Sequence, residues 1–521
     1  MCCPRIVACE NGIPALFGTR HPPSPSDNRA NLVRHPLHKK NPPLRIQFLL
    51  GADAANPERF GGIARFQCSW YYAVMIDDQR GRDGGNRTNN IMRQGRHLLR
   101  AAILFLGLSP ALSQTAPVYS VRNYGAKGDG VSDDTAAFQK ALDAAGQVGG
   151  GTVEAERGNY FFAGHLNVPP AVALQGLWKS VPAHLGLRDA GRDKPADNGT
   201  TFLITENQGN ESGPPFIRLN DNSTLSGVVL YYPRQTPDQE PKPYPYAIAA
   251  GGKNPAVLEV EMLNPYNGID VSGSERHLLR NISGQPLRRG IYMDNIYDIG
   301  RLENVHFNPW WCRANTAAYQ WQMAHGEAFI FGRSDWEYVL NTFCFGYKAG
   351  YKFIQTPRGE CNGNFLGIGA DDCCTAVLVE QCAPFGLLIA NGEFTSFHGP
   401  DPTMVVVGSG NRGAVRFSNC AFWGPCNQIA KIAGTGTVGL SDCTFCDWDH
   451  QNQGLAAVQV AGGNVLVRGC EFQRDKTQVE LGAEVRRAVI SDNIIKGKLR
   501  VTSRGSRKFQ IHDNAAEEPQ P

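Results

Sequence analysis

Short apolar segments alternate with Asn, Asp or Gly along the chain after residue 220, and this alternation repeats. Six segments share the order apolar, any, Asn/Asp/Gly, any, any, apolar: 302–307, 389–394, 417–422, 440–445, 467–472 and 490–495. From Asn391 the polar position recurs after 28, 23, 27 and 23 residues. Each unit holds two or three short strands rich in β-branched and aromatic residues. The pattern predicts an all-β solenoid in which each unit forms one coil.

A solenoid of this kind sets the place of the repeated residues. Strands of successive coils should pair in parallel about 4.8 Å apart and bury a shared core. The repeated Asn or Asp suits a turn in the left-handed conformation, with its side chain bonded to the next coil. Cys420, Cys443 and Cys470 occupy equivalent positions and are expected to fill the core as an internal row.

A helix is predicted before the first coil. Ser132 or Asp133 is a suitable N-cap, and residues 136–145 supply apolar positions at helical spacing. Gly149–Gly151 should end the helix, and Thr152 begins a strand. We expect the helix to cover the open end of the solenoid. Asp129, Asp133 and Asp134 are assigned to turns and capping.

The segment YSVRNYGAKGDGVSDDTAAFQKALDAA, with GGGTVEAERGNYFFAGHLNV after it, covers residues 119–168. It resembles the opening of the rhamnogalacturonase/epimerase-like pectate lyase superfamily. The resemblance implies a right-handed, single-stranded parallel β-helix with a short N-terminal capping helix. It also implies an exported protein that acts on a polysaccharide. It does not fix the activity, because one fold hosts hydrolases, lyases, epimerases and phage tailspikes.

Residues 92–116 have the anatomy of a secretory signal peptide. Arg93, Arg96 and Arg100 precede an apolar stretch at 101–108, and Ala111-Leu112-Ser113 is a small-x-small cleavage site. We therefore expect residues 1–91 to be an over-extended gene start, 92–113 the signal peptide and 114–521 the β-helix domain. The mature protein is expected to be secreted or periplasmic.

The net charge of the expected mature chain bears on the kind of partner it binds. Residues 1–113 contain 15 Lys+Arg and 7 Asp+Glu. Of the 51 Lys+Arg and 48 Asp+Glu in the whole chain, this leaves 36 basic and 41 acidic residues after Ser113, a net charge of −5. A mildly acidic mature chain does not favour a nucleic-acid partner. No apolar run reaches the roughly 18 residues needed to span a bilayer.

The predicted catalytic residues are Asp371, Asp372 and Glu393. Glycoside hydrolysis needs two carboxyl groups about 5–10 Å apart, which stacked coils can supply. Asp371-Asp372-Cys373 resembles the DDC motif of polygalacturonase-type hydrolases, in which paired aspartates share acid and base work. Aligning the coils places Asn341, Asp371-Asp372, Glu393 and Asn419 at matching positions. An Asp-Asp turn at a coil corner is the structural alternative.

A second concentration of polar and aromatic residues lies at 306–360. Residues 308–327 break the coil rhythm and are predicted to form a loop over the sheet, where binding residues are common. The predicted substrate-binding residues are Trp310, Trp311, His325, Arg333, Trp336 and Arg358. At least one of Trp310 and Trp311 should be exposed, because neighbouring residues of a strand point to opposite faces.

These observations predict a glycoside hydrolase that acts on a pectin-like or other cell-wall polysaccharide. The alternatives are a uronate lyase and a non-catalytic glycan-binding or adhesion β-helix. No metal site or cofactor is predicted for a hydrolase. A lyase of this architecture would use Ca²⁺, and oxygen ligands at Asp371, Asp372 and Glu393 would suit that ion.

Overall fold

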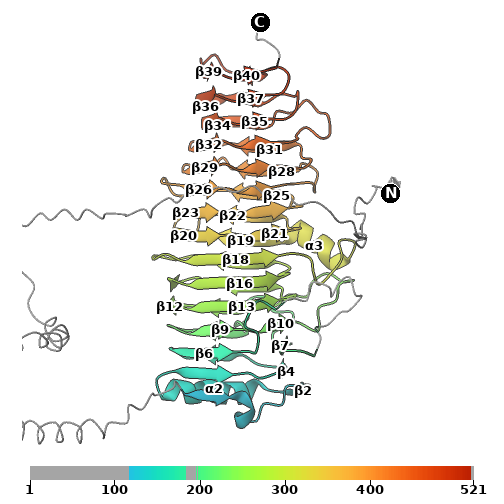
Figure 1. Ribbon diagram of the computed structural model, residues 1–521, viewed down its shortest axis with the longest axis vertical. Helices are drawn as coiled ribbons and strands as arrows, with labels where there is room; N and C mark the ends of the chain where they lie inside the picture. Colours follow the sequence, from blue (N-terminus) through green and yellow to red (C-terminus); the bar gives the residue numbers. More distant parts are fainter. Residues whose placement is uncertain (1–116, 183–194, 196, 518–521) are drawn as a thin grey trace, which may run out of the picture. The chain divides into compact units, whose positions relative to one another are not determined.

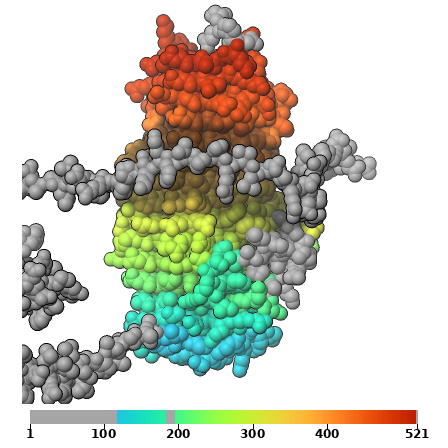
Figure 2. All heavy atoms as spheres, viewed as in Figure 1, coloured from blue at the N-terminus to red at the C-terminus, as the bar shows by residue number. Residues whose placement is uncertain are grey.

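The computed structural model describes residues 117–182, 195 and 197–517, so the predicted gene-start segment and signal peptide lie outside the described residues. The described chain winds into stacked coils, as Figure 1 shows, and Figure 2 shows the coils following one another in sequence order along the stack. Every pairing between named strands in the described part is parallel. The predicted class, an all-β parallel β-helix with a helix at its N-terminal end, is confirmed.

The strands stack in three columns, which the chain visits in a fixed order. Column 1 holds β1 (Val118–Ser120), β3 (Gly151–Glu154), β6 (Val172–Gln175), β9 (Thr224–Ser226), the first parts of β13 (Ala256–Met262), β16 (Leu278–Gly284) and β18 (Arg301–Phe307), then β20 (Ser334–Leu340), β23 (Cys361–Leu366), β26 (Leu387–Ala390), β29 (Ala414–Ser418), β32 (Thr437–Ser441), the last parts of β34 (Val458–Arg468) and β36 (Val479–Ser491), and β39 (Gln510–His512).

Column 2 holds β2 (Asp129–Asp133), β4 (Gly158–Phe162), β7 (Thr200–Ile204), β10 (Val229–Tyr231), the last parts of β13, β16 and β18, then β21 (Phe343–Phe345), β24 (Gly369–Asp371), β27 (Glu393–Phe394), β30 (Ala421–Phe422), β33 (Thr444–Phe445), β35 (Glu471–Phe472), β37 (Ile494–Ile495) and β40 (Ala515–Ala516).

Column 3 holds β5 (Leu166–Val168), β8 (Ile217–Leu219), β11 (Tyr246–Ala250), β14 (Asn267–Asp270), β17 (Arg289–Met293), β19 (Glu327–Phe331), β22 (Ala349–Phe353), β25 (Thr375–Val379), β28 (Thr403–Val407), β31 (Gln428–Ile432), the first parts of β34 and β36, and β38 (Val501–Ser503). The short strands β12 (Gly252–Lys253) and β15 (Ser274–Glu275) pair separately between columns 3 and 1.

The turn between columns 1 and 2 carries the repeated Asn or Asp. These residues take left-handed backbone angles, with φ 53° at Asn281, 54° at Asn304 and 54° at Asn391. The Asn304 amide donates to Asn281 Oδ1 at 2.7 Å, and the Asn419 amide donates to Asn391 Oδ1 at 2.8 Å. The predicted turn and its bonds from coil to coil are confirmed, and they fix the register of the stack.

Removing one side-chain amide from this series of Asn–Asn hydrogen bonds should weaken the stack. Asn304→Ala loses the bond to Asn281 and puts an ordinary side chain at positive φ, so we expect a loss of about 1–2 kcal/mol in the free energy of unfolding. Asn304→Gly keeps the backbone conformation and should lose less. Chemical denaturation of both variants measures the difference, and a glycine variant no more stable than the alanine variant would contradict this account.

The core is continuous along the stack. Phe329 stacks on Tyr351 and Phe331 on Phe353, each pair with ring centroids 4.9 Å apart. Cys420, Cys443 and Cys470 are buried. They directly precede Ala421, Thr444 and Glu471, which pair with one another in register on adjacent coils. The predicted internal row of cysteines is therefore confirmed. Cys420, Cys443 and Cys470 are free thiols.

The N-terminal end is closed by α2 (Thr135–Gln147), which follows the short 3-10 helix η1 (Val121–Tyr124). Phe138 of α2 packs edge-on against Tyr160, Phe162 and Phe202, at centroid distances of 4.9, 5.0 and 5.5 Å. Asp134, one residue beyond the predicted positions, is the N-cap. Its carboxylate accepts the backbone N–H groups of Lys127 at 2.6 Å and Gly128 at 3.0 Å, so it ties the preceding turn to the helix.

The stretch 308–327 was expected to be a loop, but it contains the helix α3 (Ala317–His325). Thr316 caps this helix, because its side chain accepts the Tyr319 N–H at 3.4 Å. Tyr319 and Met323, four residues apart, are buried against a small cluster that includes Trp311. The periodic signal was weak because only these few side chains face the body of the stack. No helix in the described ranges is long and apolar enough to cross a membrane.

Candidate functional site

The outward face of column 3 carries two rows of polar side chains. One row runs from Arg218 through Ala249 and Asp270 to Tyr292, each in register with the next. The neighbouring row runs through Tyr246, Asn267, Arg289 and Glu327. Because paired strands lie about 4.8 Å apart, side chains on these rows are direct neighbours. We call this surface the column-3 face.

Asp270 is a carboxyl group that lies in a pocket of this face. It lines a pocket of about 200 Å³ together with Arg218, Tyr246 and Ser272. Burial raises the pKa of Asp270, and the nearby Asp294 carboxylate raises it further. Hydrogen bonds from Ser272, including its N–H at 2.8 Å, and the charge of Arg218 act in the opposite direction on this pKa. Asp270 is therefore a carboxyl group whose proton is held more tightly than usual.

Asp294 lies on the adjacent coil, two residues beyond the register partner of Asp270. Such diagonal neighbours on paired strands have Cα atoms about 7–8 Å apart. Asp294 Oδ1 accepts the Arg333 N–H at 2.8 Å and the Thr356 hydroxyl at 2.9 Å. Two carboxyl groups thus share one surface in unlike surroundings, one enclosed in a pocket and one held by two donors.

Arg289, in the second row, interacts with the acidic and phenolic side chains around it. Its guanidinium lies 3.5 Å from Glu211, which also accepts the Asn267 amide at 3.2 Å. Burial disfavours the charged form of Arg289, but Tyr246, Glu211 and Glu327 together raise its pKa. Burial also raises the pKa of the Tyr246 phenol, to which Arg289 is hydrogen-bonded. Arg289 is a fixed cation with a neutral phenol beside the Asp270 pocket.

The connections from column 2 to column 3 form the entry rim of the face. Trp321 of α3 packs against Tyr266 at 5.6 Å and His325 at 4.7 Å between ring centroids. The Arg288 guanidinium donates to the His325 carbonyl at 2.9 Å and lies 3.6 Å from Glu327. His325, predicted from the sequence as a binding residue, lies on this rim and is exposed.

The turns from column 3 to column 1 form the exit rim. Arg333 and Arg358, two of the predicted binding residues, lie in these turns, and a third, Trp336, lies at the edge of the rim near the start of β20. Arg333 lies over the Tyr297 ring at 3.8 Å, and Trp336 stacks near Phe385. Arg358 is exposed, and its N–H donates to Thr356 Oγ1 at 3.1 Å. The structure therefore brings four of the six predicted binding residues to the two rims of one face.

The other two predicted binding residues lie at the base of α3. Trp311 is buried, with 2% of its surface exposed, in the cluster beneath the helix. Its assignment as a sugar-binding residue is corrected, because a side chain enclosed by Tyr319 and Met323 is a packing residue. Trp310 is half-buried and packs on His306 at 4.9 Å between centroids.

Asp371, Asp372 and Glu393 belong to column 2. The Thr395 hydroxyl donates to Asp371, while Asp372 accepts the Tyr319 hydroxyl at 3.1 Å and pairs with His398 Nδ1 at 2.7 Å. Burial raises the pKa of Asp372, against the opposing effect of His398 and Tyr319. Their catalytic role stays a prediction.

The coil alignment that grouped these three residues was wrong. Leu366 pairs with Ala390 and Gly369 with Glu393, so Gly367, and not Asp371-Asp372, occupies the position of Asn391. Glu393 is exposed and faces Gly369. The described residues contain no group of three or more His, Cys, Asp and Glu side chains that could hold a metal ion. Asp371, Asp372 and Glu393, the residues expected to bind Ca²⁺ in a lyase, therefore do not form such a group.

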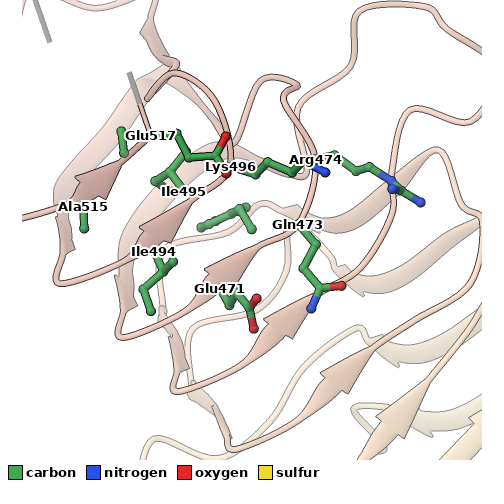
Figure 3. A pocket seen from close by; sticks show the side chains of 10 residues that line it. Glu471, Gln473, Arg474, Ile494, Ile495, Lys496, Ala515 and Glu517 are labelled. Carbon is green, nitrogen blue, oxygen red and sulfur yellow. The ribbon is translucent and has the colours of Figure 1, made fainter. Parts of the chain in front are cut away.

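Another hollow, of about 630 Å³, lies on the last coils of column 2 (Figure 3). Ile494 and Ala515 line it together with the charged side chains of Arg474, Lys496 and Glu517. None of the residues predicted from the sequence lies in it.

The sequence analysis missed Asp270, Asp294 and their neighbours, although a signal was present. Asn267-Gly-Ile-Asp270 and Arg289-Gly-Ile-Tyr292 share a Gly-Ile pair at a spacing of 22 residues, close to the coil period. Aligning these two segments would have placed Asp270 beside Tyr292.

The fold and the site define a parallel β-helix protein with two carboxyl groups in unlike surroundings on one sheet face. Residues 118–239 match the family described as Rhamnogalacturonase A/epimerase, pectate lyase-like. This match confirms the resemblance of residues 119–168 to that superfamily. The chain is therefore similar to the pectate lyase-like β-helix proteins, a family of polysaccharide-active enzymes.

Two curated relatives match a short segment. Mannuronan C5-epimerase AlgE1 of Azotobacter vinelandii is 59% identical over 46 residues, which are 9% of this chain and 3% of that protein. Alginate lyase 7 of the same organism is 54% identical over 46 residues, 9% of this chain and 5% of that protein. The chain thus spans only a small part of the length of these relatives.

A solved structure extends the likeness over most of the stack. The N-terminal fragment of gene product 12 of bacteriophage Phi29 has a TM-score of 0.56 at 14% sequence identity, over 81% of this chain and 73% of that chain. This similarity supports the fold alone.

Proposed function

We propose that the chain is a glycoside hydrolase that cleaves a polysaccharide lying along the column-3 face. The observation that carries the proposal is the pair Asp270 and Asp294, two carboxyl groups on adjacent coils in unlike surroundings. Environments that separate the properties of two carboxyl groups assign one as acid and the other as base. Asp270, whose pKa is raised, is the acid.

In this reaction Asp270 donates its proton to the oxygen of the glycosidic bond as that bond breaks. Asp294 accepts a proton from the attacking water. The Arg333 N–H and the Thr356 hydroxyl hold the Asp294 carboxylate in its orientation. The Cα atoms of such diagonal neighbours lie about 7–8 Å apart, which allows the two carboxyl groups to stand at the separation of inverting enzymes, about 6.5–9.5 Å, with room for that water. We therefore expect inversion at the anomeric carbon.

The substrate class follows from the rings and charges of the face. Trp321 and Tyr266 pack together on the entry rim, and their aromatic rings suit the flat faces of sugar rings. The cations along the face are matched by carboxylates: Arg288 and Lys352 lie near Glu327, and Arg289 lies near Glu211. A pectin-like or other cell-wall polysaccharide fits this surface.

A panel of pectic, alginate and β-glucan polymers tests the proposal. New reducing ends, without the ultraviolet absorbance of an unsaturated sugar, would support hydrolysis. Retention on an affinity gel without any product would favour the non-catalytic glycan-binding alternative. Proton NMR of the first products would show whether the anomeric configuration inverts.

A second candidate is proton abstraction beside the carboxylate of a uronate, which leads to elimination or epimerisation. It is favoured by the Arg289–Tyr246 pair, because a fixed cation could neutralise the uronate carboxylate while the phenol or Asp270 exchanges a proton. The names of the two curated relatives point to the same chemistry. Ultraviolet absorbance of the product, or incorporation of solvent deuterium without cleavage, would favour this candidate.

The role of Asp270 as an acid gives a pH prediction. An acid must be protonated, so turnover should fall as the pH rises through the pKa of Asp270. Arg218 lowers that pKa, and Arg218→Ala should therefore move the alkaline limb of the kcat/KM profile to higher pH. Arg412→Ala, at an exposed arginine on another turn, is the control. A limb that stays in place or moves to lower pH would argue against Asp270 as the acid.

We also propose that the protein is exported, on the signal-peptide pattern of residues 92–113. Cell fractionation followed by N-terminal sequencing tests this, and a mature protein that begins within residues 1–91 would contradict it.

A further inference from the structure

The exit rim carries a row of aromatic rings, two of them exposed, that the proposed chemistry does not use. Tyr297 is 52% exposed and Phe385 is 63% exposed. Trp336 and Phe385 stack with centroids 6.4 Å apart and planes inclined by 21°. Together with Arg333, these residues form what we call the exit ledge. Large apolar rings left in water beside a polar groove mark a binding surface.

The backbone at Trp336 is built to hold its ring outward. Ser334 pairs with Cys361 and Glu337 pairs with Gly363, so Asp335 and Trp336 together oppose the single residue Asn362. This extra residue is a β-bulge, a device that redirects a side chain near functional sites. Trp336 takes a left-handed backbone conformation with φ 52°, which is strained for a bulky residue.

A buried network holds both ends of this bulge. The Ser334 hydroxyl donates to Glu337 Oε2 at 2.6 Å, and Glu337 Oε1 lies 2.9 Å from His277 Nε2. Both His277 and Glu337 are completely buried. His277 Nδ1 in turn lies 3.0 Å from the Ser274 hydroxyl. Because Ser334 and Glu337, on either side of the Asp335–Trp336 bulge, are anchored in the core, the strained turn keeps its shape.

Arg333 and Tyr297 extend the ledge toward the carboxyl groups. The Arg333 guanidinium covers the Tyr297 ring at 3.8 Å and donates to the Ile296 carbonyl. The Arg333 N–H bonds Asp294 at 2.8 Å, so the ledge is continuous with the proposed catalytic pair. From the turn of Tyr297 to that of Phe385 the ledge spans three coil steps, about 14 Å along the stack.

We propose that the exit ledge is an accessory sugar-binding subsite on which rings of the polysaccharide stack beyond the point of cleavage. The identity of the polymer rests on the proposed function. Three features support a glycan as the occupant: Tyr297 and Phe385 are open to solvent, the Arg333 guanidinium and the Asp294 carboxylate lie beside the rings, and the ledge runs in the same direction as the column-3 face. Stacked rings with polar neighbours match the apolar face and the hydroxyl edge of a sugar.

The test measures binding separately from turnover. Trp336→Gly removes the ring and suits the positive φ, so folding should be maintained. We combine it with Phe385→Ser and measure retention of the intact protein in affinity gels containing polygalacturonate, alginate or soluble β-glucan. Trp423→Ala, at a tryptophan 38% exposed outside the ledge, is the matched control. The double variant should bind the retained polymer about tenfold more weakly, as expected when two stacking contacts are lost, while the control binds like the wild type.

Kinetics on long and short substrates provide the second readout. The double variant should show a raised KM on the polymer and an unchanged kcat, with little change on the shortest oligosaccharide that is cleaved. Equal polymer binding by the double variant and the wild type would overturn the ledge while leaving the proposed hydrolysis intact. Polymer binding by the wild type without any turnover would contradict the proposed hydrolysis but not the exit ledge as a binding subsite. A wild-type protein that binds none of the three polymers would overturn the ledge.

Discussion

Replacing Asp270 by Asn should reduce kcat by about 10²–10⁴-fold, the usual contribution of a general acid. The substitution keeps the shape of the side chain and its bond with the Ser272 N–H, but it removes the proton that the leaving oxygen needs. Binding of the polymer should persist, because the rims are untouched. Initial rates of reducing-end formation, measured with affinity-gel retention of the same variant, separate the two effects.

Two further variants locate the reaction on the molecule. Asp294→Asn should lower kcat to a similar extent, because it removes the base. Asp372→Asn distinguishes the two assignments: turnover is lost if the Asp371–Asp372 pair of column 2 does the chemistry, and is kept if the column-3 face does. Full activity of Asp270→Asn together with an inactive Asp372→Asn would return the site to the position predicted from the sequence.

The fold was predictable because its signal repeats. Each coil needs one residue that tolerates a left-handed backbone between columns 1 and 2, and Asn281, Asn304, Asn391 and Asn419 mark that turn directly. The capping helix was equally readable, since Phe138 and its neighbours show helical spacing before a run of glycines. Such local requirements recur in every coil, so a single sequence reveals them.

The candidate site depended on differences between coils, which the repeat does not encode. At Gly367 a glycine replaces the turn asparagine, and this substitution shifted the apparent alignment of Asp371 and Asp372 by four residues. The bulge at Trp336 likewise inserts a residue into one coil. Which carboxyl groups meet is decided by these register changes, and Asp270 and Asp294 became neighbours only once the pairing was known.

The residues of the two rims were easier to single out from the sequence than the paired carboxyl groups, for a physical reason. Aromatic and guanidinium side chains in irregular segments are conspicuous in composition, and His325, Arg333 and Trp336 all lie on the rims. The exception, Trp311, illustrates the limit of composition. The helix α3 folds over it, and a helix of nine residues with few buried side chains leaves little trace in the sequence.

Replacing Glu337 by Ala should destabilise the protein by about 1–3 kcal/mol for each buried donor left unsatisfied, because its fully buried carboxyl group bonds both His277 and the Ser334 hydroxyl. The substitution leaves His277 Nε2 without its acceptor in a site closed to water, and it frees the Ser334 hydroxyl. Glu380→Ala is the matched control, because its carboxylate pairs with Lys352 at 3.3 Å but is half exposed, and such pairs contribute about 0–1 kcal/mol.

Thermal and denaturant unfolding of the two variants measures this difference, and a loss at Glu337 no larger than at Glu380 would contradict it. Glu337→Ala also tests whether the buried network controls the shape of the exit ledge. If the network holds the bulge, near-ultraviolet circular dichroism of Trp336 should change in Glu337→Ala and not in Glu380→Ala, and polymer retention should fall with it. A destabilised variant with an unchanged tryptophan signal would separate the two roles, and it would mean that the network supports the stack without shaping the ledge.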